Sequence, residues 1–221
     1  MNLSSETLAV LKNFSAINSN IVIRPGQTLK TMSEAKNIMA SATVAETFPN
    51  EFGIYDLNEF LSVVGMFEAP TLNFDSDMKY VTIVDGKRSV KYFFSDTSIL
   101  TSPSKDITMP PCELVFNLSA DDLGALRKAA GALGVSDVVV SGGTATVTDV
   151  KDSTANSFSV DIDVTTNPSE SYSFVFNINN FKLLTGDYQV SVSSKLISLF
   201  KNQDTDVEYY IALEKSSTFG E

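Results

Sequence analysis

Few residues in this 221-residue chain have the types and spacing that catalysis requires. The chain contains no histidine, which excludes Ser-His-Asp and Cys-His nucleophile systems and histidine-ligated zinc. The single cysteine, Cys112, has no histidine to activate it, and we expect it to be a small core residue. It cannot form an intramolecular disulfide, which suits a reducing cytoplasm.

Three short polar runs have the composition of ligand-binding loops but not their full chemistry. Asp75–Asp77 and Asp204–Glu208 concentrate carboxylates, but both lack the glycine and the distal glutamate of a calcium-binding EF-hand. Ser141–Thr144 contains two glycines, but no Gly-Lys-Ser/Thr and no following helix, so we interpret it as a hairpin turn rather than a phosphate loop. We therefore expect solvated turns here, with no metal or cofactor. A hydrolase that uses a pair of acids is a distant alternative.

The charge and hydropathy of the chain limit its partners. The net charge is −11, and 43% of the residues are hydrophobic, which is typical of a globular protein. Residues 1–110 carry 9 basic and 12 acidic residues, whereas residues 111–221 carry 7 and 15. Because this charge opposes nonspecific binding to nucleic acid, any contact with DNA must come from locally segregated basic residues. No apolar run is long enough to span a membrane, and the first thirty residues lack the pattern of a signal peptide.

The elements that would position functional side chains occur twice. Residues 3–12 and 118–127 share a leucine, a serine, an acidic residue, two leucines three apart and a basic residue, and an apolar strand-like stretch follows each. We expect one helix from Ser4 to about Ile17 and a second helix capped by Ser119. Their predicted apolar faces are Leu8, Leu11, Phe14 and Ile17 in the first helix, and Leu123, Leu126, Ala130 and Leu133 in the second.

A further pair of helices supports the duplication. Asp56 can cap a helix, with Glu59 three residues later as in a capping box. The apolar stripe of this helix is Leu57, Phe60, Leu61 and Val64. Residues 177–184 echo the run, with the Asn58/Asn179 and Phe60/Phe181 pairs in register. Each half of the chain is therefore predicted to contain two short amphipathic helices.

The rest of the chain carries strand signals. Asp85-Gly86 predicts a hairpin of residues 80–84 with residues 89–94. Two glycines predict another hairpin, of residues 138–140 with residues 144–150. Residues 157–164 alternate in hydropathy and predict one strand with a single dry face. Further strands are expected at residues 21–23, 29–32, 38–44, 52–55, 71–74, 113–118, 174–176, 188–193, 195–200 and 207–213.

Residues 95–111 divide the chain. They are rich in serine, threonine and proline and lack periodicity, which is typical of a semi-extended linker. We therefore predict an N-terminal domain at residues 1–98, an interdomain linker at residues 99–111 and a C-terminal domain at residues 112–221. The predicted fold class is α+β, with two duplicated domains.

Several of these features resemble DNA sliding clamps. They are the two-fold repeat, the position of the linker, the helix at Asp56–Leu61 and the near-terminal strand Tyr209–Leu213. The length and the runs Leu11–Phe14 and Ile17–Ser19 are most similar to the processivity clamps of T-even-type bacteriophages. The trimeric clamps called proliferating cell nuclear antigen have a similar Tyr-Tyr-aliphatic-Ala ending. The resemblance covers essentially the whole chain.

The resemblance implies a non-enzymatic, head-to-tail homotrimer. Six clamp-type domains would form a ring with antiparallel sheets outside and short helices inside. Double-stranded DNA would pass through the ring without sequence-specific contacts, and the ring would tether the replicative DNA polymerase for processive synthesis. Further implied partners are an ATP-driven clamp loader and the factors of phage late transcription. No membrane is implied as a partner. The implied location is the cytoplasm of an infected bacterial host cell.

Two sets of site residues follow from the resemblance. The predicted DNA-facing residues are Lys12, Arg127, Lys128 and Lys182, and the alternative is that they are solvated charges on helix faces. The predicted client-peptide pocket is lined by Ile107, Met109, Tyr210, Ala212 and Leu213, and the alternative is that Tyr210 and Leu213 are ordinary core residues.

Two questions stay open at the level of the sequence. Residues 89–94 and 157–164 are the candidates for exposed edge strands at a subunit interface. The alternative function is a non-enzymatic phage structural or assembly protein built of repeated β-rich domains. The acidity of the chain and its lack of catalytic groups also fit that alternative.

Overall fold

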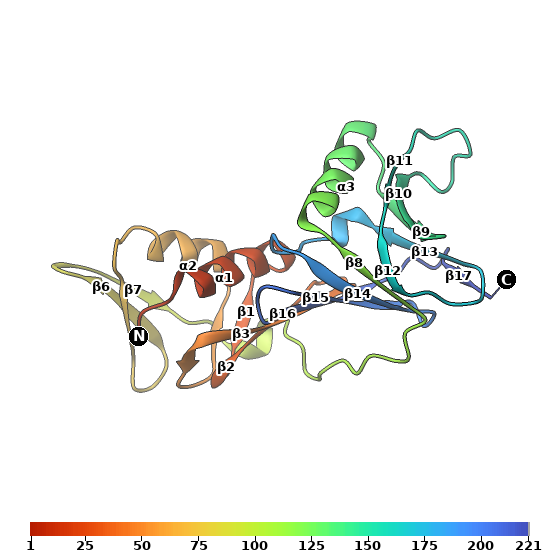
Figure 1. The fold of residues 1–221 in the computed structure, drawn as a ribbon. Coiled ribbons are helices and arrows are strands. Elements are labelled where there is room, and N and C mark those ends of the chain that lie inside the picture. Colours follow the sequence, from red (N-terminus) through yellow and green to blue (C-terminus); the bar gives the residue numbers. More distant parts are fainter. Residues whose placement is uncertain (221) are drawn as a thin grey trace. The chain divides into compact units, whose positions relative to one another are not determined.

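The computed structural model describes residues 1–220 and divides the chain into two compact units (Figure 1). The first unit is Met1–Asp106, and the second unit begins at Ile107. Each unit contains antiparallel strands with at least one helix packed against them. The division falls inside the predicted linker, whose bounds stay a prediction.

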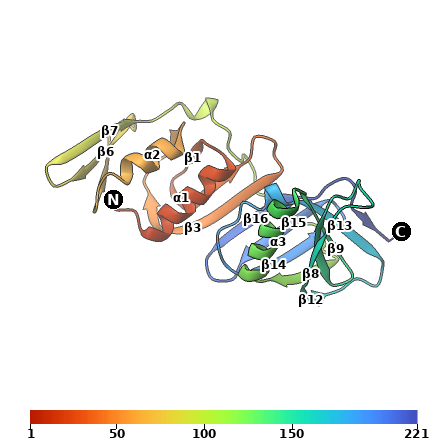
Figure 2. The same cartoon turned by 90° about the horizontal axis from the view of Figure 1, so that it is seen from above.

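Two helices belong to the first unit, and each begins at a capping side chain. In α1 (Ser5–Ile17), the Ser4 side chain accepts a hydrogen bond from the Thr7 amide at 3.2 Å. In α2 (Leu57–Val64), the Asp56 side chain accepts one from the Glu59 amide at 2.9 Å. These bonds satisfy amides that a helix leaves free at its N-terminus, so the predicted starts are confirmed. Figure 2 shows α1 lying along β3, and α1 also packs against α2.

The strands of the first unit pair in antiparallel groups. The pairs are β1 (Ile21–Ile23) with β4 (Phe52–Ile54), β2 (Gly26–Met32) with β3 (Ile38–Phe48), and a sheet of β5 (Thr71–Phe74), β6 (Tyr80–Asp85) and β7 (Arg88–Phe93). The predicted Asp-Gly hairpin joins β6 to β7, and Gly86 has a φ of 60°, which glycine adopts without strain. β7 is an edge strand of its three-stranded sheet.

The second unit has one helix, α3 (Ala120–Leu133). The Ser119 side chain accepts a hydrogen bond from the Asp122 amide at 3.0 Å, as predicted. Leu123, Leu126 and Ala130 are buried, as predicted, but Leu133 is 37% exposed. The assignment of Leu133 to the apolar face was wrong because the helix ends at this residue and the chain turns away at Gly134, whose φ is 69°.

The strands of the second unit follow two antiparallel orders. One sheet has the order β11-β10-β9-β13-β17, and the other contains β12-β8-β14-β15-β16 as successive neighbours. The bounds are β8 (Leu114–Leu118), β9 (Asp137–Ser141), β10 (Thr144–Thr148), β11 (Phe158–Asp161), β12 (Asp163–Thr166), β13 (Tyr172–Asn177), β14 (Tyr188–Ser193), β15 (Ile197–Asn202), β16 (Val207–Ala212) and β17 (Thr218–Phe219). The predicted hairpin between β9 and β10 is confirmed, and Gly142 and Gly143 both have positive φ.

The single strand predicted at residues 157–164 is two strands in different sheets. Ile162 separates β11 from β12, and its amide donates to the Gly143 carbonyl at 3.0 Å. Its side chain is buried. The alternation of hydropathy continues through this point, but the backbone changes its pairing partner there. That change depends on contacts far away in the sequence.

The second helix predicted for the C-terminal half is also wrong. Residues 177–184 form only the 3₁₀ turn η2 (Ile178–Asn180). The carbonyls of Phe181 and Leu183 accept hydrogen bonds from Arg127 instead of from a continuing helix. The Leu184 amide donates to the hydroxyl of Tyr209 at 3.1 Å. Long-range bonds therefore replace the local ladder that a helix requires.

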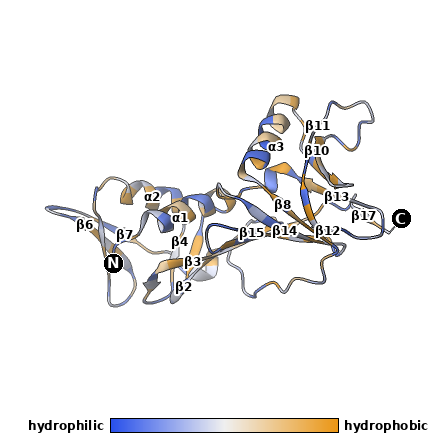
Figure 3. Ribbon diagram, in the orientation of Figure 1, coloured by the Kyte–Doolittle hydropathy of each residue, from blue (hydrophilic) through white to orange (hydrophobic). Residues whose placement is uncertain are grey.

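Each unit has its own apolar core. Figure 3 marks the hydrophobic residues along the strands and helices of both units. Fully buried side chains of the first unit include Leu11, Phe14, Leu29, Ile54 and Leu57. Those of the second unit include Phe174, Phe176, Tyr188, Phe200 and Tyr209. Among residues 1–220, no helix is long and apolar enough to cross a membrane.

Candidate nucleic-acid interface and client-peptide pocket

Lys12 lies on the solvent side of α1. Leu11 and Phe14, close to it in sequence, are fully buried and hold the helix on β3, whereas Lys12 is exposed. Among the described residues, no carboxylate forms an ion pair with Lys12. The first unit therefore presents this charge to solvent from helix α1.

Arg127 and Lys128 are neighbours on α3, but they have different surroundings. Lys128 is exposed. The Arg127 guanidinium donates from Nη2 to the Phe181 carbonyl and, at 3.4 Å, to the Leu183 carbonyl. Burial lowers the pKa of Arg127, because it removes water from the charged group. Arg127 thus ties the segment after η2 to α3, which is a structural role that the sequence did not indicate.

Lys182 is brought to the same part of the second unit by that tie. In the sequence, Lys182 stands between Phe181 and Leu183, whose carbonyls Arg127 binds. The amide of Lys182 donates to the Asn180 carbonyl at 2.8 Å. The side chain is half-buried. The structure therefore brings Arg127, Lys128 and Lys182 together on two adjacent segments, while Lys12 belongs to the other unit.

Two glycines on the exposed side of α3, Gly124 and Gly131, were not among the site residues predicted from the sequence. A Cβ atom added at Gly124 or Gly131 would meet no atom within 4 Å, so neither glycine is required by the packing of this chain. Both are exposed, as is Lys128 between them. Together they give α3 a smooth surface from which the lysine projects. A run of small residues at this helix was the signal in the sequence.

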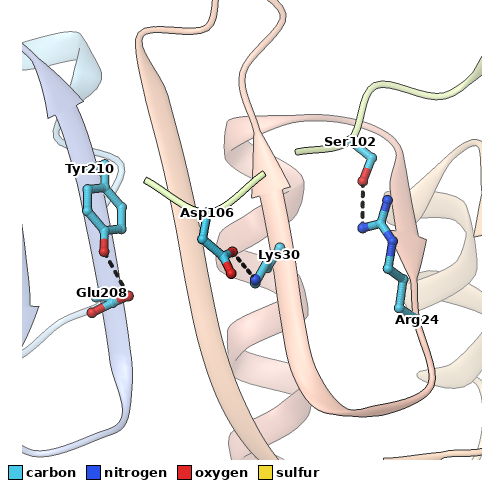
Figure 4. A network of polar contacts seen from close by, with 6 residues as sticks. All are labelled: Arg24, Lys30, Ser102, Asp106, Glu208 and Tyr210. Carbon is cyan, nitrogen blue, oxygen red and sulfur yellow. Dashed lines mark hydrogen bonds and ion pairs between the residues drawn. The ribbon is translucent and has the colours of Figure 1, made fainter. Parts of the chain in front are cut away.

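The residues predicted for a client pocket lie on β16, at Leu213 directly after it, and on the segment before β8. Along β16, Tyr209 and Ile211 are buried, while Tyr210 and Ala212 are half-buried on the opposite face. The hydroxyl of Tyr210 donates to a carboxylate oxygen of Glu208 at 3.2 Å (Figure 4). Leu213 is only 6% exposed, which matches its alternative interpretation as a core residue. Ile107 and Met109 are half-buried.

The other polar runs contain ordinary turns. The Asn202 side chain accepts from the amides of Asp204 and Thr205, both at 2.9 Å, which fixes the turn between β15 and β16. Within residues 1–220, no group of three or more acidic or cysteine side chains could hold a metal ion. Cys112 is half-buried rather than a core residue, because it lies just before β8, where its thiol donates to the Pro110 carbonyl.

Comparison with known proteins decides the family. Residues 4–98 match the family described as DNA polymerase processivity factor, and residues 115–215 match the C-terminal domain of the gp45 sliding clamp. A sliding clamp of Vibrio phage KVP40 is 31% identical over 97% of this chain and 99% of that protein. This chain belongs to the sliding-clamp family. Sliding clamps of Escherichia phage RB69 and Enterobacteria phage T4 are 27% and 26% identical, each over 99% of both chains.

Solved clamp structures share the fold. Proliferating cell nuclear antigen from Thermococcus kodakaraensis aligns with a TM-score of 0.71 and 12% identity over 97% of this chain and 99% of that chain. The protein of the same name from Entamoeba histolytica aligns with a TM-score of 0.68 and 14% identity over 94% of both chains. The clamp fold is therefore confirmed, and this clamp is a processivity factor rather than the phage structural protein of the alternative interpretation.

Proposed function

We propose that this clamp forms a head-to-tail homotrimeric ring that encircles double-stranded DNA and tethers the replicative DNA polymerase. The observation that carries the proposal is the full-length similarity to phage sliding clamps. A closed ring holds DNA by topology, so it needs no strong contact with individual phosphates. This suits a chain with a net charge of −11, because strong phosphate binding would slow sliding.

The proposed subunit interface joins β7 of one copy to β11 of the next. Both are edge strands, and each leaves a row of backbone groups for another strand. β7 carries Arg88 and Lys91 and no acid, whereas β11 carries Asp161 and no base. Phe93 at one edge is 65% exposed, and Phe158 at the other is 37% exposed. Opposite charge therefore favours pairing of these two edges, and pairing would also cover apolar surface that each edge now exposes.

The alternation of side chains constrains how these edges pair. Val90 and Tyr92 lie on the face of their sheet that carries the buried β6 residues, and Val160 lies on the face with buried Ala145. A continuous sheet that keeps both apolar faces on one side places Lys91 and Asp161 together on the other side. Electrostatic attraction between these two residues then contributes to the choice of register.

The DNA-facing residues that we propose are Lys12, Arg127, Lys128 and Lys182. The exposure of Lys12 and Lys128 supports their part in the proposal. Arg127 supports it more weakly, because its guanidinium already binds two carbonyls. The two glycines of α3 let a duplex approach the helix closely, so that Lys128 can contact a phosphate.

Other functional features complete the proposal. Residues 99–111 act as an interdomain linker, and Ile107, Met109, Tyr210, Ala212 and Leu213 receive a client peptide. Because a closed ring cannot thread onto circular DNA by itself, an ATP-driven loader opens it. The clamp acts without catalysis, metal or cofactor in the cytoplasm of the infected bacterial cell, and it also serves late-transcription factors.

A primer-extension assay tests the proposal. A primed single-stranded circle is copied by a T-even-type phage polymerase with its loader and ATP, with and without this clamp, while a trap captures dissociated polymerase. We expect much longer products from single binding events when the clamp is present. Products of unchanged length with a polymerase that responds to its own clamp would contradict the tethering role. Light scattering should give a mass near three subunits, and a strict monomer at micromolar concentration would contradict the ring.

A further inference from the structure

We propose that the first unit carries a binding site for an acidic side chain in an extended segment of a partner protein, and that Asp106 occupies this site in the free chain. The site is a hollow of about 320 Å³. Residues of β1, of β2 and of the connection between them form one wall, and residues 103–106 form the other. The site uses none of the residues assigned to the client-peptide pocket, and it requires neither the ring nor DNA.

Three basic side chains line the hollow, namely Arg24, Lys30 and Lys105. The only acidic residue among its lining residues is Asp106. This concentration of positive charge is unusual in a chain with 16 basic and 27 acidic residues. Among the described residues, no carboxylate forms an ion pair with Lys105. The hollow therefore attracts a carboxylate.

Backbone pairing and polar contacts position two of these three cations, Lys30 and Arg24. Lys30 lies in β2 and pairs across the ladder with Ser41 of β3. Arg24 lies between β1 and β2, and its Nε is 3.6 Å from a carboxylate oxygen of Glu51. Its Nη1 donates to the hydroxyl of Ser102 at 3.0 Å (Figure 4). A fixed guanidinium loses less side-chain entropy on binding than a mobile one.

Asp106 is the internal substitute for the ligand. Its carboxylate accepts a hydrogen bond from the Lys30 ammonium (Figure 4). The Lys30 side chain is only 27% exposed, whereas that of Asp106 is 77% exposed. A solvent-exposed ion pair of this kind is weak, because water screens it. A carboxylate from a partner can therefore replace Asp106 at Lys30 while the lysine stays where it is.

The shape of the hollow favours a peptide over nucleic acid. Val22, Pro25 and Pro103 add apolar surface to its lining, which suits the carbon atoms of a peptide. The volume accommodates one or two side chains rather than a duplex. Residues 100–113 contain no helix or strand, so Asp106 itself shows how an extended segment presents a carboxylate to Lys30.

Fluorescence anisotropy with the full chain tests the site. The probe is a fluorescein-labelled, amidated peptide with the sequence Gly-Leu-Asp-Asp-Leu-Gly. We expect Asp106→Asn to bind the probe about twofold to fivefold more tightly, because the internal competitor loses its charge. Lys30→Gln should weaken binding at least fivefold. Matched surface controls are Glu34→Gln, which also removes one negative charge, and Lys87→Gln, which also removes one positive charge; both should bind as the wild type does.

The outcomes separate the proposal from its rivals. Tighter binding by Asp106→Asn and weaker binding by Lys30→Gln, with unchanged controls, would support the site. Equal effects of Lys30→Gln and Lys87→Gln would overturn it, because binding would then follow net charge. A second control probe has both aspartates replaced by asparagine and is made in two forms, one amidated and one with a free C-terminal carboxylate. If either form bound as tightly as the aspartate probe, the proposal would be overturned, because binding would not need an acidic side chain. Competition by a DNA oligonucleotide as strong as that by the unlabelled peptide would show a phosphate site instead.

Discussion

Arg127 and Lys128 show how adjacent charges on one helix acquire different roles. Arg127 is half-buried and satisfies two carbonyls, whereas Lys128 is exposed. The family resemblance predicted that both face DNA. A helical wheel only separates polar from apolar positions, and it does not show which polar group has a partner inside the protein. That distinction depends on Phe181 and Leu183, which lie more than fifty residues away.

The stabilities of two variants test this distinction. Arg127→Gln should lower the free energy of unfolding by about 1–3 kcal/mol, because it removes charged donors from two carbonyls. Lys128→Gln should change it by less than about 0.5 kcal/mol, as is usual for an exposed residue. Urea unfolding at pH 7 measures both. Equal and small changes would contradict the structural role of Arg127.

Tyr92 makes a prediction for alkaline pH. Burial, with help from the charges of Glu59 and Asp56, raises the pKa of Tyr92 to about 12 from its ordinary value of 10.0. Because the folded-state pKa is the higher one, the neutral phenol is favoured in the folded state. Its stabilising contribution is complete below pH 10 and is lost as the pH rises from 10 towards 12.

The Tyr92→Phe variant checks this linkage. The wild type should lose more stability than the variant between pH 10 and 12, by less than about 2 kcal/mol because the group is partly solvated. Denaturant unfolding at each pH gives the difference. The hydroxyl also donates to the Asp56 carbonyl at 3.2 Å, so the variant should be slightly less stable at pH 8. Identical pH profiles for the two proteins would contradict the raised pKa.

At the scale of elements, the predictable features were those with local causes. The caps Ser4, Asp56 and Ser119 mark three helix starts, and each side chain accepts a hydrogen bond from the amide three residues further along. The turns at Asp85-Gly86 and Gly142-Gly143 were also predictable from the sequence. Gly86, Gly142 and Gly143 have positive φ angles, which favour glycine. The duplication itself followed from these local signals.

The failures had long-range causes. Residues 177–184 repeat the pattern of α2, yet Arg127 and Tyr209 bind the backbone groups that a helix would use. Ile162 interrupts a regular alternation by bonding to Gly143. The basic hollow at Lys30 joins strand residues to a segment more than seventy positions away, so no window of sequence reveals it.

The glycines of α3 provide a test at this scale. Gly124→Ala and Gly131→Ala should each raise the free energy of unfolding by about 0.5–1 kcal/mol, because alanine restricts the unfolded chain and the added methyl meets open space. Gly134→Ala is the matched contrast. It should lower stability by about 1–2 kcal/mol, because its φ is 69°. Thermal or urea unfolding measures all three.

The function of the two helix glycines needs a separate readout. If the two glycines let DNA approach α3 closely, the added methyl group of Gly131→Ala should hinder that approach. The variant should then be more stable than the wild type but support shorter polymerase products. Full processivity in both alanine variants would show that the smooth surface of α3 does not serve DNA.

At the scale of the whole molecule, the acidic chain and its few local basic groups fit the proposed ring, which binds DNA phosphates only weakly. Exposed basic residues include Lys12 and Lys128, and further positive charge lies along the β7 edge and at the hollow around Lys30. In the proposed ring, assembly depends on the β7 and β11 edges, whose charges are opposite.

A charge exchange tests the interface. Lys91→Asp and Asp161→Lys should each raise the dissociation constant of the trimer, because each puts like charges on the two edges. The double variant should recover much of the lost affinity. Sedimentation over a range of protein concentrations measures the constants. If the double variant recovered none of the lost trimer affinity, Lys91 and Asp161 would not be in contact across the interface. Lys87→Asp, in the turn before β7, is the control and should have a smaller effect.

Retention on circular DNA tests whether the clamp is linked topologically to the duplex. The clamp is loaded with loader and ATP onto nicked circular duplex, freed of unbound protein at moderate salt, and divided into two samples, one of which is cut once by a restriction enzyme. We expect the clamp to stay on the intact circle and to leave the linear DNA through its ends. Equal retention on the two forms would contradict a topological link between ring and duplex.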